Sequence, residues 1–203
     1  MPNWCQNYVE VSHEDSSKIR ALADAMERNE FLNHVIPVPE DLKATIAGSY
    51  SDEEQQQLLV EQTIRNVDKY GFGNWYDFCT SRWGTKWDVA CQGAVDVHPE
   101  GTVVTASFNS AYAPPIGIYE KLVEDGYSVR AYYYESGMCF AGIWDNGDDD
   151  CYQKWGDSRG ARATLPEELD DFFAISESQA EYEDEEEELS NWIREGVENR
   201  ENI

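Results

Sequence analysis

The chain has 203 residues and a net charge of −26 at pH 7, and 13% of its residues are aromatic. This length allows one well-buried core, so we expect a single domain with an appendage. The acidity disfavours direct binding to nucleic acid or to an anionic membrane, because every phosphate contact needs a cation on the protein. It favours a basic partner protein, and the alternative that acidity serves only solubility or adaptation to salt stays open.

No apolar run approaches the eighteen or so residues of a membrane helix, and the first residues lack the basic and apolar regions of a signal peptide. We therefore expect a soluble, cytoplasmic protein. The five cysteines are widely spaced without a CxxC pair, and the three histidines stand apart. This spacing predicts neither a metal site nor a disulfide framework. The glycines show no phosphate-binding spacing, so no cofactor is predicted.

In chain order, alternating side chains over Asn7–Ser12 predict a first strand, and Ser16–Met26 has the capping residue and core spacing of a helix. Phe31–Pro39 is predicted to be extended, because each proline biases the residue before it away from helix. Three further helices are predicted: a short one after Pro39, one from Ser51 to about Tyr70, and one from Asn74 to Arg82. The second has apolar and polar side chains at roughly helical spacing, namely Leu58, Leu59, Gln62, Ile64 and Val67.

The following hundred residues are mainly β-prone, with one helix that begins at Pro114-Pro115 and ends at Asp125-Gly126. The predicted strands are Thr85–Cys91 with a continuation over Ala94–His98, Thr102 toward Ala111, Tyr127–Glu135, Gly137–Trp144 and, after a turn at Asp145-Asn146-Gly147, Asp150–Lys154.

This order predicts an α+β fold of the ferredoxin-like βαββαβ type, an antiparallel sheet with helices on one face. We expect residues 1–155 to form this domain, with a helical insertion at about 31–82, and residues 156–203 to form an acidic helical appendage. Residues 163–203 hold 15 acidic residues and two arginines, which is half of the net charge in one fifth of the chain. Such a like-charge run is usually solvated.

Several motifs occur in a recognisable order along residues 1–155. They are Asn3-Trp4-Cys5-x-Asn7, Phe31…Pro37-x-Pro39, Trp75-Tyr76, Trp83-Gly84-Thr85-Lys86-Trp87-Asp88, Ala111-Tyr112-Ala113-Pro114-Pro115, Tyr134-Glu135-Ser136-Gly137 and Phe140-Ala141-Gly142. In this order the chain resembles the YubB-type ferredoxin-like proteins of phages and plasmids, a domain family of unknown function. The resemblance implies the ferredoxin-like fold, a mobile-element origin and the cytoplasm of a bacterial host cell, and it supplies no catalytic residues.

Candidate catalytic residues follow from the tryptophan-rich cluster. A desolvated lysine between two tryptophans, Lys86, is a potential nucleophile or base, with Asp88, Glu135 or the thiol of Cys5 as further candidates. The competing interpretation is structural: Lys86 pairs with Asp88 or Glu135, or lays its stem along the indole faces. Likewise Asn3, Trp4, Cys5 and Asn7 form either a small polar pocket or an anchor for the first strand.

The acid itself offers a mechanism that needs no catalysis. A protein that presents carboxylates at the charge density of a duplex would compete for a basic nucleic-acid-binding groove. We therefore predict a non-enzymatic acidic binding protein that inhibits a basic host nucleic-acid-binding or defence protein as a DNA mimic. The alternatives are a small enzyme with a pocket at the tryptophan cluster, or a structural accessory protein. The predicted partner-binding residues are Glu181, Glu183, Asp184, Glu185, Glu186, Glu187, Glu188, Asp148, Asp149 and Asp150.

Overall fold

The computed structural model describes residues 2–201, with side chains as far as residue 194, so residues 202 and 203 of the predicted appendage lie outside the described residues. The chain divides into two compact units. Unit 1 comprises Met1–Met138 and Gly142–Asp150, and unit 2 comprises Cys139–Ala141 and Cys151–Ile203. No helix of the described residues is both long enough and apolar enough to cross a membrane.

The sheet has six strands in the order β2-β3-β1-β4-β5-β6. β1 is central and pairs antiparallel with both β3 and β4. The first four strands thus take the ferredoxin-like order, with the β5–β6 hairpin added beyond β4, which confirms the predicted fold class. The strands are β1 (Trp4–Ser12), β2 (Asp96–Val97), β3 (Val103–Ala111), β4 (Ser128–Glu135), β5 (Phe140–Asp145) and β6 (Asp148–Gln153).

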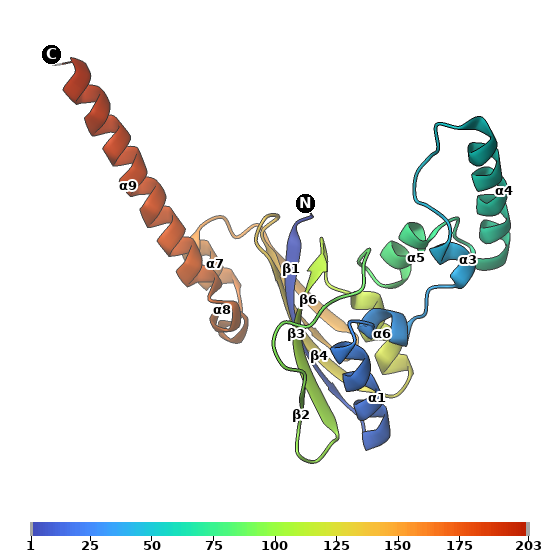
Figure 1. Ribbon diagram of the computed structural model, residues 1–203. Helices are drawn as coiled ribbons and strands as arrows, with labels where there is room; N and C mark the ends of the chain where they lie inside the picture. The colour runs from blue at the N-terminus through green and yellow to red at the C-terminus, as the bar shows by residue number, and fades with distance from the viewer. Residues whose placement is uncertain (1, 202–203) are drawn as a thin grey trace. The chain divides into compact units, whose positions relative to one another are not determined.

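Two helices, α1 (Ser16–Glu27) and α6 (Ile116–Glu124), cover one face of this sheet (Figure 1). The strands alternate, so that every second side chain of β1, β3 and β4 faces these helices and is buried. α1 begins after Asp15, whose carboxylate accepts from the backbone of Ser17. The core between sheet and helices includes Val9, Val11, Ile19, Leu22, Met26, Val104, Phe108, Ile118, Tyr119, Leu122, Val129, Ala131 and Trp144.

The helical insertion contains α2 (Phe31–Val35), α3 (Glu40–Lys43), α4 (Glu53–Tyr70) and α5 (Trp75–Arg82). The last three were predicted, whereas the extended conformation predicted for residues 31–39 is wrong over α2. No local side chain caps α2. Its first free N–H groups are instead satisfied by Asp88, which lies more than fifty residues away in the sequence.

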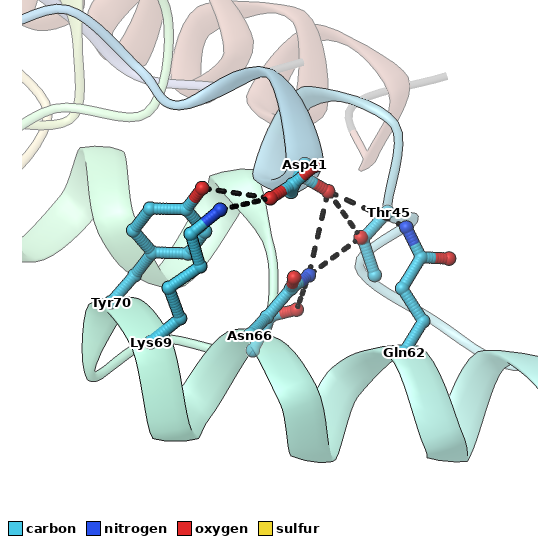
Figure 2. A network of polar contacts seen from close by, with 7 residues as sticks. Asp41, Thr45, Gln62, Asn66, Lys69 and Tyr70 are labelled. Carbon is cyan, nitrogen blue, oxygen red and sulfur yellow. Dashed lines mark hydrogen bonds and ion pairs between the residues drawn. The ribbon is translucent and has the colours of Figure 1, made fainter.

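A polar network joins α3 to α4 (Figure 2). Asp41 accepts hydrogen bonds from Lys69 at 2.9 Å and from Tyr70 at 2.7 Å through one carboxylate oxygen. Asn66 is buried on α4 and donates to the Thr45 hydroxyl at 2.9 Å. Of the apolar side chains of α4 that the helical spacing singled out, Leu59 is buried. Leu58, Ile64 and Val67 are at least half exposed, so the polar network supplies much of the contact between α4 and the α3 region.

The strand predicted over Thr85–Cys91 does not form. This segment runs irregularly and makes one isolated bridge, from Cys91 to Phe108 of β3. Its polar side chains are used for tertiary contacts instead, since Thr85 Oγ1 donates to the backbone oxygen of Ala111 at 2.9 Å. Only the predicted continuation is a strand, and it is the two-residue β2.

Unit 2 contains α7 (Ser158–Thr164), α8 (Glu167–Phe173) and α9 (Ile175–Glu201). A small core of Ala161, Leu165, Leu169 and Ile175 is buried among them. α9 is anchored near its start, where Gln179 accepts a 3.0 Å hydrogen bond from the indole of Trp155. The helical character predicted for this acidic region is therefore confirmed.

Candidate functional site

The acidic segment Glu181–Glu188 lies within α9, and each of its residues is exposed. Glu183 accepts hydrogen bonds from the backbone and the hydroxyl of Ser158, at 2.8 and 2.7 Å. Glu186 accepts one from the Tyr182 hydroxyl at 2.9 Å. The other five carboxylates of the segment form no hydrogen bond and no ion pair within the described part of the chain. They are Glu181, Asp184, Glu185, Glu187 and Glu188.

Large apolar side chains follow the acidic segment directly. Leu189, Trp192 and Ile193 are 57%, 72% and 52% exposed. An exposed tryptophan beside charged residues is a typical anchor of protein–protein interfaces, because the indole buries a large area with little loss of conformational freedom. α9 thus offers both charge and apolar area.

A hollow of about 720 Å³ adds to the acidic character of unit 2. Its lining includes the carboxylates of Glu167, Asp170, Asp171 and Glu177, with Arg162 as the cation. Asp170 has a structural role there, since it accepts a 2.7 Å hydrogen bond from the backbone of Ser176. The hollow therefore adds four carboxylates and one cation to the charged side chains of unit 2.

The three predicted aspartates Asp148, Asp149 and Asp150 begin β6, the outermost strand of the sheet. Asp149 accepts a 2.7 Å hydrogen bond from the hydroxyl of Tyr133. Charged side chains along an edge strand prevent it from pairing with another chain. This location gives the three aspartates a structural purpose that does not require a partner.

Lys86 forms no ion pair within the described residues. Its ammonium lies 3.7 Å from the ring centroid of Trp87 and 5.4 Å from that of Tyr112. Of the two structural interpretations of Lys86, contact with aromatic faces is therefore the one that the structure supports.

Asp88 lines a cavity of about 490 Å³ together with Lys86, Trp75, Trp83 and Trp87. Both of its oxygens are already used: they accept from the backbone of Leu32 and Val89 at 2.9 Å and from that of Asn33 at 3.0 Å. Burial raises the pKa of the Asp88 carboxyl, and these three N–H groups oppose the rise. Asp88 thus serves as the cap of α2 rather than as a group free to transfer protons.

Glu135 and Cys5 lie elsewhere. Glu135 is 2% exposed, and its two oxygens accept from the backbone of Gly137 and Met138 at 2.8 and 2.6 Å. A catalytic thiol needs a nearby base, and His13 is a candidate for it by residue type. Cys5 is fully buried at one end of β1, whereas His13 follows the opposite end, roughly 25 Å away at 3.3 Å per residue. The four candidate catalytic residues therefore do not share one site.

The alternation of β1 also divides the predicted polar pocket. Cys5 and Asn7 are buried on the side of the helices, and Asn7 donates to the Ser110 hydroxyl at 2.8 Å. Asn3 and Trp4 instead line a cavity of about 510 Å³ with Gln6, Gln92 and Asn109, three residues that the sequence did not single out. The alternation of side chains along β1 places Trp4 and Gln6 on one face, and this could be read from the sequence. The pairing of β1 with β3, which brings Asn109 beside Gln6, could not.

In the part of the chain that the structure describes, no group of three or more histidine, cysteine or carboxylate side chains is placed to hold a metal ion. No family model matches the chain, and no curated protein matches it. A solved structure to which the chain is similar is protein Api92 from Yersinia pseudotuberculosis, described as a DUF1281 protein, with 12% identity and a TM-score of 0.38. The match covers 76% of this chain and 98% of Api92. A likeness at this level carries no argument about function.

Proposed function

We propose that the chain is a non-enzymatic acidic binding protein of a phage or plasmid, of the YubB type, which inhibits a basic nucleic-acid-binding or defence protein of its host by mimicking nucleic acid. The observation that carries the proposal is the charge density of α9. Seven carboxylates occupy the eight residues Glu181–Glu188. At a rise of 1.5 Å per residue this is about one charge per 1.7 Å of helix axis, the spacing of charge along a DNA duplex.

The charge of the acidic segment is available to a partner. Five of its seven carboxylates have no internal hydrogen bond or ion pair among the described residues, and all seven side chains are exposed. Like charges three and four positions apart on a helix repel each other by about 0.2–0.5 kcal/mol per pair. A basic groove would relieve this repulsion, so the unbound helix is already poised for a cationic partner.

Binding of this kind has a recognisable salt dependence. Attraction between the acidic segment and a basic groove is long-ranged at low salt and is screened at high salt, where the Debye length falls to a few ångströms. Association should therefore be fast at low ionic strength and weaken steeply as salt is added. Trp192 supplies an apolar contact that salt does not weaken.

The test is a pull-down from host lysate that compares the wild type with two variants of equal net charge. The five-amide variant replaces the five unengaged carboxylates of α9 and keeps Glu183 and Glu186, so that the contact with Ser158 survives. It carries E181Q, D184N, E185Q, E187Q and E188Q. The matched control variant removes five exposed carboxylates of unit 1 whose side chains form no hydrogen bond or ion pair within the described residues. It carries D24N, E27Q, E54Q, D68N and E120Q.

We expect the wild type and the matched control variant to retain the same basic nucleic-acid-binding protein at low salt and to release it at high salt. The five-amide variant should retain little of it. A partner that binds all three proteins equally, or that stays bound from low to high salt, would contradict the proposal.

A further inference from the structure

The cavity beside Trp4 is chemically unlike the rest of this acidic protein. Its volume is about 510 Å³, and four of its lining residues carry neutral side-chain amides: Asn3, Gln6, Gln92 and Asn109. Within the described residues none of these amides forms a side-chain hydrogen bond. Four amides together present both donors and acceptors to whatever enters the cavity.

The backbone brings these amides together and fixes their positions. Gln6 on β1 lies directly opposite Asn109 on β3 in the strand register, so their Cβ atoms are about 5 Å apart. The backbone N–H of Gln92 donates to Ser107 at 2.7 Å, which holds Gln92 beside β3. Asn3 is held by its backbone oxygen, which accepts from Tyr112 at 2.9 Å.

One wall of the cavity is an exposed indole. Trp4 is 46% exposed and lies on the same face of β1 as Gln6, because the two are separated by one residue. Its ring packs against Trp87 with centroids 6.4 Å apart, which restricts its orientation. The indole therefore presents a flat apolar surface next to a set of neutral hydrogen-bonding groups.

The charge at the cavity excludes most anionic ligands. Among the described residues, no lysine or arginine lines it, and the one carboxylate is that of Glu135. Each Glu135 oxygen accepts one backbone N–H, from Gly137 or from Met138, and the side chain is 2% exposed, so Glu135 places a negative charge behind the cavity wall. A phosphate group would be repelled here, whereas a neutral ligand would not be.

We propose that this cavity binds a neutral polyhydroxylated ligand, a sugar. The ring face of a pyranose would stack on Trp4, and its hydroxyl groups would exchange hydrogen bonds with the amides of Gln6, Gln92 and Asn109. A nucleobase would also stack on the indole, but it offers one polar edge and not a ring of hydroxyls. This binding does not depend on the acidic segment of α9.

Gly137 provides a way to distort the cavity without removing any of its polar groups. A Cβ atom at this position would lie 2.6 Å from Nδ2 of Asn3 and 2.9 Å from Oε1 of Glu135. The G137A substitution therefore forces the Asn3 amide and the Glu135 carboxylate out of their present positions and distorts the cavity.

The test is a titration of the ¹⁵N-labelled full chain with D-glucose, D-galactose and N-acetyl-D-glucosamine, and with adenosine as a nucleobase probe. We expect at least one sugar to shift the side-chain amide signals of Gln6, Gln92 and Asn109 and the indole signal of Trp4 in a saturable manner. The Q92A and W4A variants should weaken the affinity roughly three- to tenfold each, the range that corresponds to one hydrogen bond or one stacking contact. G137A should abolish the shifts.

The control is Q57A, which removes an exposed amide from α4 and should leave the titration unchanged. W4A changes a residue of β1 and could lower the stability of the sheet. Gln92 lies outside the strands, so Q92A tests ligand binding without that complication. The absence of shifts with all three sugars would overturn the proposal, and so would shifts that appear with adenosine alone or that persist unchanged in Q92A and G137A.

Discussion

The carboxylate of Asp88 accepts a 2.9 Å hydrogen bond from the backbone N–H of Leu32, so a side chain distant in the sequence caps the start of α2. The same carboxylate accepts from Asn33 and Val89. One acidic residue therefore joins the helical insertion to the tryptophan-rich segment, and it does so with groups that a catalytic carboxylate would need to keep free.

We expect Asp88→Ala to lower the free energy of unfolding by about 1–3 kcal/mol, because it leaves partly buried N–H groups without an acceptor. Urea unfolding measures the loss. The exposed Asp24→Ala change is the control and should alter stability by no more than about 0.5 kcal/mol. A similarly small effect of Asp88→Ala would show that water replaces the carboxylate without loss.

The pH dependence of this effect has a definite sign. Burial raises the pKa of Asp88 above its ordinary value of 3.8, so the folded protein binds this proton more tightly than the unfolded chain. The corresponding stabilisation is fully present below the unfolded pKa and is lost as the pH rises through the folded pKa. The stability difference between wild type and Asp88→Ala should thus shrink as the pH rises above about 4, the ordinary pKa of an aspartate. A difference that grows over this range would contradict the assignment.

Asp41 shows the opposite shift. Hydrogen bonds from Lys69 and then from Tyr70 hold the pKa of Asp41 below its ordinary value (Figure 2). Its contribution to stability is present above the unfolded pKa and is lost as the pH falls through the lower folded pKa. Tyr70→Phe removes one of these hydrogen bonds, so an NMR titration should give Asp41 a higher pKa in the variant than in the wild type. An unchanged value would mean that Lys69 alone sets it.

The cysteines should differ strongly in reactivity. Burial raises the pKa of Cys79 to about 12, which leaves almost no thiolate at neutral pH, and Cys5 is fully buried. Cys151 is exposed. A thiol reagent followed by mass spectrometry should therefore label Cys151 first and reach Cys5 and Cys79 only when the protein unfolds. Rapid native labelling of Cys5 would revive the thiol-enzyme hypothesis.

Repulsion within the acidic segment should be visible in hydrogen exchange. Seven like-charge pairs lie three or four positions apart within Glu181–Glu188, and the five-amide variant removes six of them. At about 0.2–0.5 kcal/mol per pair, exchange of these amides should slow roughly tenfold or more in the variant. Peptides from α4 provide the internal reference and should not change. Equal exchange of the segment in both proteins would indicate that the repulsion is already relieved.

The features predicted from the sequence are those that depend on local pattern. The alternation in β1, the core spacing in α1 and α6, and the turn before β6 all predicted elements of the right type, and their order was enough to indicate the ferredoxin-like fold. The helix over α9 was also predicted, although its exposed carboxylates oppose it, because Leu189, Trp192 and Ile193 follow the acidic segment at helical spacing.

The features that were missed depend on contacts between distant segments. α2 has no local cap, and its conformation follows from Asp88. The segment before β2 has a strand-like composition, but Thr85 and Asp88 commit their side chains to other elements, so no ladder forms. The cavity beside Trp4 arises from the register of Gln6 with Asn109, which periodicity within one strand does not specify.

The central claim, that the acidic segment of α9 occupies a groove built for nucleic acid, is tested most directly by competition. A fluorescent duplex is bound to the basic protein that the wild type captures, and its displacement is followed at low and high salt. We expect the wild type and the matched control variant to displace the duplex at low salt and much less at high salt, while the five-amide variant fails at both. Equal displacement by all three proteins, or simultaneous binding of the duplex and the wild type, would contradict the account.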